Sequence, residues 1–485
     1  MARKLVASVA LASLIGLGAP AVARATVDNG GRADRTVQQF QWGTAAACRT
    51  PLRESPDPAA PEACAAIDGR PVSEARMQAY ESSWVHRALS LQRGLDEGAP
   101  LAEEQLPHTH NSFNASSYRL GSTSYYPTLT NQDPNQVYSL TDQLRMDIRA
   151  VEIDLHWWPS PYGNASTGGK WVTMCHGDSG EVPGVHIGCT WDRPLQDGLQ
   201  EVATWLRAHP DAFILLYLEN QLNGDPQAHQ IAAQLIADNL GDLVYQPPAG
   251  QPCADMPLDA SRADMREGAG HQVLIVGNCG PGAWGDWVHE RGPQPQHWDE
   301  SGNPATYSEA DCARDQSQRQ ADSTFRRWYE DSTWVTNMVN GSNELITPAT
   351  TARMVACGVN IIGFDQLTPQ DPRLAALVWS WAQDEPRAGA GDCAYQGADT
   401  RFHAGGCDQR RHFACADSAG GWHVTNAVGR WSRGAAACAA QFPGTSFGVP
   451  ANGYRNQLLA NANPKPNDGV WLDYAVADGT WAPAA

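Results

Sequence analysis

The feature that most constrains the fold is an alternation of short apolar runs with helical patterns over roughly 280 residues that begin near residue 101. One of these runs, residues 213–218, is apolar throughout, as expected of a strand that is covered on both faces. The segment 194–208 carries an apolar stripe at helical spacing. The remaining predicted strands are 150–155, 171–175, 273–276 and 360–364, and the remaining helices are 227–240 and 372–382. This order predicts a parallel α/β fold, and a (β/α)8 TIM-type barrel matches its size.

The barrel is expected to be one of four parts of the chain, covering residues 101–387. Residues 1–25 resemble a secretory signal peptide, because Arg3 and Lys4 precede a short apolar stretch and then small residues. Residues 26–100 are predicted to be an N-terminal extension with helical pattern near 73–91. Within the barrel region, residues 281–350 are irregular and rich in tryptophan, so we expect long loops there.

The fourth part, residues 392–485, is rich in cysteine and tryptophan and follows a glycine-rich linker. Four of its cysteines fall within 46 residues, so we expect a small, mainly β domain supported by disulfides. The whole chain has 12 cysteines and no Cys-x-x-Cys motif, which favours structural disulfides over zinc or redox chemistry. We expect cysteines adjacent in sequence to pair, as in Cys48–Cys64 and Cys175–Cys189. Together with the signal peptide, this predicts a secreted or periplasmic protein.

Charge and hydropathy exclude several classes of protein. The net charge is -19 with only 34 Lys+Arg, which argues against a nucleic-acid-binding protein and against a polybasic membrane patch. No apolar run beyond the N-terminus reaches the ~18 residues of a membrane span, so no transmembrane segment is predicted.

Polar residues gather where the predicted strands end, which is where barrel enzymes place their sites. Strand side chains alternate faces, so Glu152 and Asp154 point the same way. Three acids and an amide form an oxygen ligand set that suits calcium or magnesium, and two histidines beside it can supply an acid and a base. The residues concerned are His110, Asn111, Glu152, Asp154, His176 and Glu219.

Each of these residues also has a structural interpretation. Glu152 and Asp154 could form ion pairs with Arg145 or Arg149, and Arg149 could equally support the site. Glu219 could cap the following helix. Asp365 ends a late strand, where it could orient His110 or cap a helix.

The segment from about residue 104 to 220 resembles the catalytic X region of phosphatidylinositol-specific phospholipase C. The resemblance rests on four motifs in the family's order: His110-Asn-Ser, Arg149-Ala-Val-Glu-Ile-Asp154, His176-Gly and Ile214-Leu-Leu-Tyr-Leu-Glu219-Asn. The family has a metal-independent branch, which carries an arginine where Asp154 stands, and a calcium-dependent branch. The chain is similar to the second branch, but it has no separate lipid-targeting domain.

The resemblance implies Ca2+ as cofactor, with Asn111, Glu152, Asp154 and Glu219 as its ligands. It implies a phospholipid or another phosphodiester as substrate, which is compatible with peripheral contact with a membrane. In that chemistry a substrate hydroxyl attacks phosphorus and His176 protonates the leaving oxygen. His110 removes the proton or hydrogen-bonds the phosphoryl oxygens, and Glu152 or Glu219 is an alternative base.

The C-terminal part resembles the C-type lectin-like fold over residues 430–484. The similarity lies in Trp431-Ser-Arg-Gly-Ala-Ala-Ala-Cys438 and in the tryptophans of Val470-Trp-Leu-Asp-Tyr474 and Gly479-Thr-Trp481. The calcium motif with which that family binds carbohydrate is missing, so a structural or protein-contact role is the alternative.

The sequence therefore predicts an exported, calcium-dependent phosphoric diester hydrolase. A glycerophosphodiester-type hydrolase of broader range is one alternative, although the His-Arg-Gly motif usual in that class is missing. The other alternative is an inert barrel in a secreted protein that binds a glycan or a partner.

Overall fold

The structure is a computed structural model that describes residues 74–118, 134–160, 162–175, 189–268, 270–292, 297–321, 324–332 and 345–483. The predicted signal peptide, most of the N-terminal extension, the cysteines Cys48 and Cys64, and His176 lie outside these residues.

Eight parallel strands form a curled sheet whose strands follow one another around it in chain order. β10 pairs with β1, so the first and last of these strands in the sequence are neighbours in the sheet. β7 and β8 are the two edge strands, and they do not pair with each other in the described residues. The predicted barrel is confirmed as a TIM-type sheet that is open at the seam between β7 and β8. The strands are β1 (Leu106–Thr109), β2 (Ala150–Pro159), β5 (Ile214–Gln221), β6 (Val273–Gly277), β7 (His289–Glu290), β8 (Trp298–Ser301), β9 (Phe325–Tyr329) and β10 (Ile361–Phe364).

Two expectations about strands need correction. The predicted strand 171–175 exists as β3 (Lys170–Cys175), but it runs antiparallel to β2 and pairs with β4 (Cys189–Pro194), so it belongs to an excursion and not to the barrel. The region 281–350 is not only loops, because it supplies β7, β8 and β9. These strands are short and interrupted by charged residues, so they lack the apolar run that marks β5.

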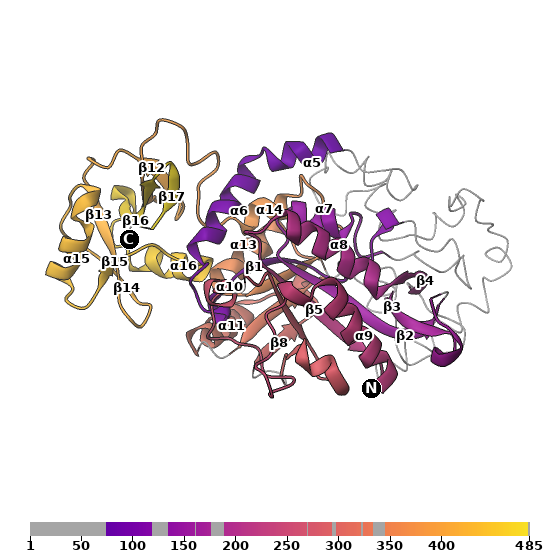
Figure 1. Cartoon of the computed structure of the whole chain (residues 1–485). Coiled ribbons are helices and arrows are strands. Elements are labelled where there is room, and N and C mark those ends of the chain that lie inside the picture. The colour runs from indigo at the N-terminus through magenta and orange to yellow at the C-terminus, as the bar shows by residue number, and fades with distance from the viewer. Residues whose placement is uncertain are drawn as a thin grey trace.

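Helices cover the outside of the curled sheet, and two N-terminal helices run along one side of it (Figure 1). The N-terminal pair is α5 (Glu74–Glu81) and α6 (Trp84–Leu95), where helical pattern is predicted. The others of this region are α7 (Leu140–Arg145), α8 (Leu195–Ala208), α9 (Pro226–Asn239), α10 (Arg262–Arg266), α11 (Glu309–Ala321), α13 (Pro348–Cys357) and α14 (Pro372–Leu377). No described helix is long and apolar enough to cross a membrane.

Alternation along each strand separates two apolar layers. On β2, Val151 and Ile153 join the large core between sheet and helices, while Ala150 joins a smaller cluster inside the barrel. On β5, Leu216 likewise faces the helices and Leu215 the barrel interior. Because side chains alternate along a strand, the polar residues at even positions of β2 share the interior face with Ala150. The inner apolar cluster therefore forms a floor below the polar ends of the strands.

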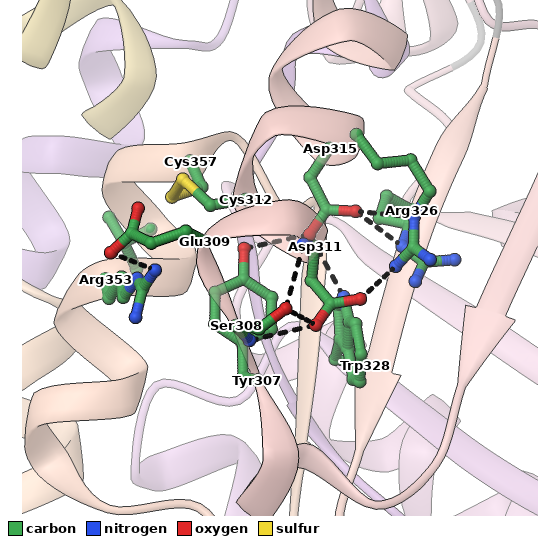
Figure 2. The surroundings of a disulfide bond; sticks show 12 residues. Tyr307, Ser308, Glu309, Asp311, Cys312, Asp315, Arg326, Trp328, Arg353 and Cys357 are labelled. Atoms are coloured by element: carbon green, nitrogen blue, oxygen red, sulfur yellow. Dashed lines mark hydrogen bonds and ion pairs between the residues drawn. A yellow bond between two sulfur atoms is a disulfide. The ribbon is translucent and has the colours of Figure 1, made fainter.

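β9 carries two adjacent arginines on opposite faces. Arg326 points outward, where its Nε lies 2.9 Å from Asp315 on α11. Figure 2 shows Asp315 directed toward Arg326 and Trp328, next to the disulfide that joins Cys312 of α11 to Cys357 of α13. The Trp328 indole N–H donates to the same carboxylate at 3.1 Å. The outer face of β9 is thus fixed to α11 by a buried acid.

The C-terminal unit (yellow in Figure 1) is a mixed β-sheet that carries disulfides. The path β12-β11-β16-β13-β14 is extended by β15 on β13 and by β17 on β16. Its elements are β11 (Cys393–Gln396), β12 (Phe402–Gly405), β13 (His412–Ala416), β14 (Trp422–Val424), β15 (Ser446–Phe447), β16 (Val470–Ala477), β17 (Thr480–Ala482), α15 (Gly434–Gln441) and α16 (Gly453–Ala462).

The C-terminal unit shares a core with the barrel region. Trp381, Phe402 and Tyr474 are buried in the same apolar cluster as the outer face of the barrel strands. The helix predicted for 372–382 ends at Leu377, since Ser380 and Ala382 instead exchange backbone hydrogen bonds with Phe402. This packing lies near the N-terminal end of β1, where Gln105 accepts a hydrogen bond from the Gly453 N–H. The unit is therefore attached opposite the strand ends that carry the polar residues.

The disulfides among described residues follow the predicted rule that neighbours in sequence pair. They are Cys253–Cys279, Cys312–Cys357, Cys393–Cys407 and Cys415–Cys438. Cys175 is also disulfide-bonded. It stands opposite Cys189 in the β3–β4 register.

A buried acid cluster near the start of the barrel should make stability depend on pH. Arg262 pairs with Glu104 at 2.7 Å and with Asp96. Burial raises the pKa of Glu104 to about 8 and that of Asp96 to about 6, although Arg262 opposes both shifts. The folded state therefore holds these protons more tightly than the unfolded state, and stability falls as the pH rises through about 4.5 to 8.

We expect Glu104→Gln to reduce this fall by on the order of 2 kcal/mol between about pH 5 and pH 8, measured by urea unfolding. Glu97→Gln is the matched control, because Glu97 also contacts Arg262 but its side chain is 35% exposed. A Glu104→Gln variant with the parental slope would show that Glu104 is ionised throughout this range.

Candidate active site at the carboxyl ends of the strands

Three carboxylates converge inside the barrel where β2 and β5 end. The parallel register places Asp154 directly opposite Glu219, and Glu152 lies two residues earlier on the same face of β2. One oxygen from each carboxylate lies within 4.8 Å of the others. Glu152 and Asp154 are buried, while Glu219 is partly exposed. The predicted pair on one face of β2 is thus met by the predicted acid of the next strand.

This arrangement has the chemistry of a cation site. Burial raises the pKa of Asp154 well above its usual range, and the negative charges of Glu219 and Glu152 raise it further. Burial and Glu152 likewise raise the pKa of Glu219. A cation between the carboxylates would remove this repulsion. The all-oxygen donor set fits a hard divalent cation, so the residues present match the kind of metal that the sequence predicts.

Glu152 already has a cationic partner, which is Arg327 of β9. The Arg327 guanidinium lies 2.5 Å from Glu152 Oε2 and 3.1 Å from Glu300 of β8. The backbone N–H of Asn111 donates to the same Glu152 oxygen at 3.0 Å. Although Glu152 is buried, Arg327 and the nearby histidines hold its pKa well below the usual range. Glu152 is therefore ionised in this arrangement.

His110 follows β1 and forms a buried pair with Asp365, which follows β10. The His110 Nδ1 and the Asp365 Oδ1 are 3.3 Å apart. Burial would lower the pKa of His110, but the Asp365 carboxylate outweighs burial and raises that pKa to about 9. Asp331 offers a third group within 4.8 Å of this pair. His110 therefore has the carboxylate partner that a catalytic histidine needs to hold its ring orientation.

Asp365 is fixed by hydrogen bonds to both its side chain and its backbone. Its Oδ2 accepts from the Ser332 N–H at 2.8 Å and from Asn135 at 3.1 Å. Its N–H donates to Glu330 at 2.7 Å, and its carbonyl oxygen accepts from Arg373 at 2.9 Å. Arg373 also forms an ion pair with Glu330. The partner of His110 is thus held by a buried ionic frame.

The loops that carry these residues are strained or crowded. Asn111 and Gln366, which follow His110 and Asp365, adopt positive φ angles of 45° and 50°. Such outliers concentrate at functional sites. Gly363 leaves room for its neighbours, since a Cβ there would lie 2.8 Å from Tyr329 Cβ and 2.9 Å from His108 Cδ2. A larger residue at position 363 would displace His108 and Tyr329, and Tyr329 packs against His110.

The structure brings most of the predicted site residues to this mouth of the barrel, but not all of them. His110, Asn111, Glu152, Asp154, Glu219 and Asp365 lie there. His176 lies outside the described residues. Arg149 does not join the cluster, because its guanidinium donates to the carbonyl oxygens of Leu144 and Ile148 at the start of β2 and stacks over Trp205.

Sequence reasoning missed Arg327, Tyr329 and Glu300. Tyr329 packs against His110 with ring centroids 4.8 Å apart, and the Arg327 guanidinium lies 4.4 Å from the Tyr329 ring centroid. The segment Phe325–Tyr329 contains three aromatic residues, and aromatic residues favour a strand. Its two adjacent arginines lower its hydropathy, so the segment resembles the loops around it.

Comparison with protein families identifies this barrel. The model of the Rv2075c PI-PLC-like domain matches residues 68–371, which contain all of the residues gathered at the mouth. The chain belongs to the Rv2075c PI-PLC-like domain family. The predicted resemblance to phospholipase C is thereby confirmed for the domain. Two Mycobacterium tuberculosis relatives, the uncharacterized proteins MT2135 and Rv2075c, are each 38% identical over 428 residues, which is 84% of this chain and 82% of theirs.

Two solved structures are similar in fold to this PI-PLC-like chain. The phosphatidylinositol-specific phospholipase C from Listeria monocytogenes matches 60% of this chain and 97% of its own, with 14% identity and a TM-score of 0.40. PLC21 of S. officinalis matches 56% of this chain and 35% of its own, with 12% identity and a TM-score of 0.38.

Proposed function

We propose that the chain is a phosphoric diester hydrolase of the phospholipase C type. The observation that carries the proposal is the convergence of the His110–Asp365 pair and the Glu152, Asp154 and Glu219 carboxylates at one mouth of a PI-PLC-like barrel. His110, whose pKa Asp365 raises to about 9, carries a proton near neutral pH and can give it up or hydrogen-bond an anion. An acid cluster that suits a divalent cation provides the second element of phosphodiester chemistry.

The proposed reaction is an intramolecular displacement on phosphorus. A hydroxyl of the head group attacks phosphorus, a new O–P bond forms, and the bond to the leaving alcohol breaks. In its neutral form His110 takes the proton of the attacking hydroxyl, with Glu152 or Glu219 as the alternative base. In its protonated form, which dominates below about pH 9, it hydrogen-bonds the phosphoryl oxygens. His176 gives a proton to the leaving oxygen, and water then opens the cyclic phosphate with these roles reversed. Calcium, bound through Asn111, Glu152, Asp154 and Glu219, would stabilise the negative charge on the phosphoryl oxygens.

A product assay on phosphatidylinositol vesicles, with calcium and with a chelator, tests this function. We expect diacylglycerol and a cyclic inositol phosphate with calcium, and little product with the chelator. Cleavage of added glycerophosphoinositol to glycerol phosphate and inositol, with phosphatidylinositol left intact, would instead assign the chain to the glycerophosphodiester type. If no phosphatidylinositol is cleaved under any condition and the protein binds a glycan or another protein, the result would favour the inert barrel.

We further propose that the enzyme works outside the cytoplasm and meets its lipid substrate by peripheral contact. The predicted signal peptide and the disulfides support export. Fractionation of cells that express the full chain should place the mature protein, cleaved after Ala23 or Ala25, outside the cytoplasm. Full-length protein retained in the cytoplasm would refute export.

We also propose domain boundaries at 101–387 for the barrel and 392–485 for the C-terminal unit, with a lectin-like fold and a structural role for the latter. The shared core supports the structural role, because Phe402 and Tyr474 of the unit pack on Trp381. A chain that ends at residue 391, without the C-terminal unit, should therefore be insoluble. A soluble, active truncated barrel would show that the unit serves another purpose.

A further inference from the structure

Arg327 has an unusual position for a residue beside a cation site. It comes from β9, reaches across the barrel interior to β2, and is 3% exposed. Its guanidinium binds Glu152 on one side and Glu300 on the other. The rings of Tyr217 and Tyr329 lie 5.0 Å and 4.4 Å from it, measured to their centroids. Two ion pairs and two aromatic rings therefore hold the guanidinium in place.

The charges around Arg327 do not balance. Glu300 is shared with Arg291, which follows β7 and lies 3.1 Å from it across the open seam of the barrel. The connected interior groups are thus four carboxylates, on Glu152, Asp154, Glu219 and Glu300, and two guanidinium groups, on Arg327 and Arg291. With all of these groups ionised, two negative charges remain, and they belong to the side of the cluster formed by Asp154 and Glu219. One divalent cation would neutralise them.

We propose that Arg327 is a resident cation of this cluster, which holds Glu152 in place when no metal is bound and opposes the binding of a divalent cation there. The inference rests on the cation site of the proposed function. A metal bound to Glu152, Asp154 and Glu219 shares Glu152 with the guanidinium, so two positive groups meet at one carboxylate. Arg327 cannot move away without leaving Glu300 and the two tyrosine rings. Its positive charge therefore weakens cation binding. When no metal is bound, the same charge reduces the repulsion among the carboxylates.

Calorimetric titration of the intact protein with calcium alone tests the proposal. Arg327→Met keeps the length of the side chain and removes its charge, and we expect about tenfold tighter binding or more, because repulsion between close charges in a protein interior is strong. Arg327→Lys keeps the charge but cannot make both ion pairs of the guanidinium, so it should bind calcium more weakly than Arg327→Met does. Arg291→Met is the matched control, because it removes the same charge from the same network without touching Glu152; it should stay within about threefold of the parent.

A second measurement covers the case in which Arg327→Met folds poorly without metal. Calcium should then raise the melting temperature of Arg327→Met by more than it raises that of the parent, because ligand binding stabilises the folded state in proportion to affinity. Equal or weaker calcium binding by Arg327→Met, with an equal or smaller thermal shift, would overturn the proposal. Equal tightening by Arg291→Met would also overturn it, because the effect would then be one of net charge alone.

The outcome can be separated from that of the proposed function. If neither the parent nor any variant binds calcium, the proposal for Arg327 is refuted. The product assay on phosphatidylinositol in chelator then decides independently whether the barrel is a metal-free phosphodiesterase or has no such activity.

Discussion

His110→Ala should lower the turnover of a phosphodiester substrate by about 10²- to 10⁴-fold, the range typical of a lost general acid or base. His110 lies at the mouth of the barrel, with Asp365 3.3 Å from its Nδ1 and the acid cluster on the neighbouring strand. The loss should appear in kcat measured on phosphatidylinositol vesicles, because the proposed role of the ring is in the chemical step.

The control for this variant is a histidine outside the mouth. His209 lies at the end of α8, stacked on Trp205, so His209→Ala should keep the parental rate. His110→Ala removes the partner of the buried Asp365, so its melting temperature should fall, and turnover is compared at a temperature at which both proteins are folded. A folded His110→Ala enzyme with nearly normal turnover would remove His110 from the mechanism and leave a carboxylate as the base.

The parts of this site that could be predicted from sequence are those that local periodicity determines. Glu152 and Asp154 share a face because a strand has a repeat of two, and Glu219 ends an apolar run that can only be a buried strand. The pairing of β2 with β5, which brings Asp154 opposite Glu219, is not predicted, because the expected strand 171–175 stands between them in the sequence. Asp365 reaches His110 because β10 pairs with β1 and completes the order of strands.

The rest depends on contacts between distant segments. Arg327 lies 175 residues from Glu152 in the sequence, and the residues around Arg327 do not indicate which acid it pairs with. β9 is only five residues long and carries two arginines, so its hydropathy is that of a loop. The sequence pattern predicts that β3 is a strand, but it does not indicate that β3 runs antiparallel to β2. Arg149 has the spacing of the motif, yet local carbonyl groups take its hydrogen bonds.

Arg373→Met should destabilise the fold by about 3–5 kcal/mol, the usual cost of removing one partner from a buried ion pair. The Arg373 side chain is fully buried and so is Glu330, its partner. Arg373 also binds Asp371, the N-cap of α14, with its closest contact at 2.7 Å. Without the guanidinium, two buried carboxylates lose their counter-charge, and the carbonyl of Asp365 loses a donor. Urea unfolding followed by tryptophan fluorescence measures the change.

Two further variants separate the causes of this loss. Arg430→Met breaks a pair with Asp408 in which the two side chains are 67% and 87% exposed, so it should cost at most about 1 kcal/mol. The double variant Arg373→Met with Glu330→Gln should recover part of the stability lost by Arg373→Met, because it removes an uncompensated charge. A double variant no more stable than Arg373→Met would mean that lost packing, and not the orphaned carboxylate, causes the destabilisation.

The two adjacent arginines of β9 help to fix the register of this strand in the sheet. Arg326 binds Asp315 and Asp299 outside the barrel, and Arg327 binds Glu152 and Glu300 inside it. A slip of one residue that turns Trp328 inward would take the cation away from Glu152 and Glu300. A slip in the other direction would put Phe325 where Arg326 meets Asp315 and Asp299. Charge therefore selects a single alignment where apolar content is too low to do so. Single-residue deletions in this strand should therefore be far less tolerated than in the longer and more apolar β5.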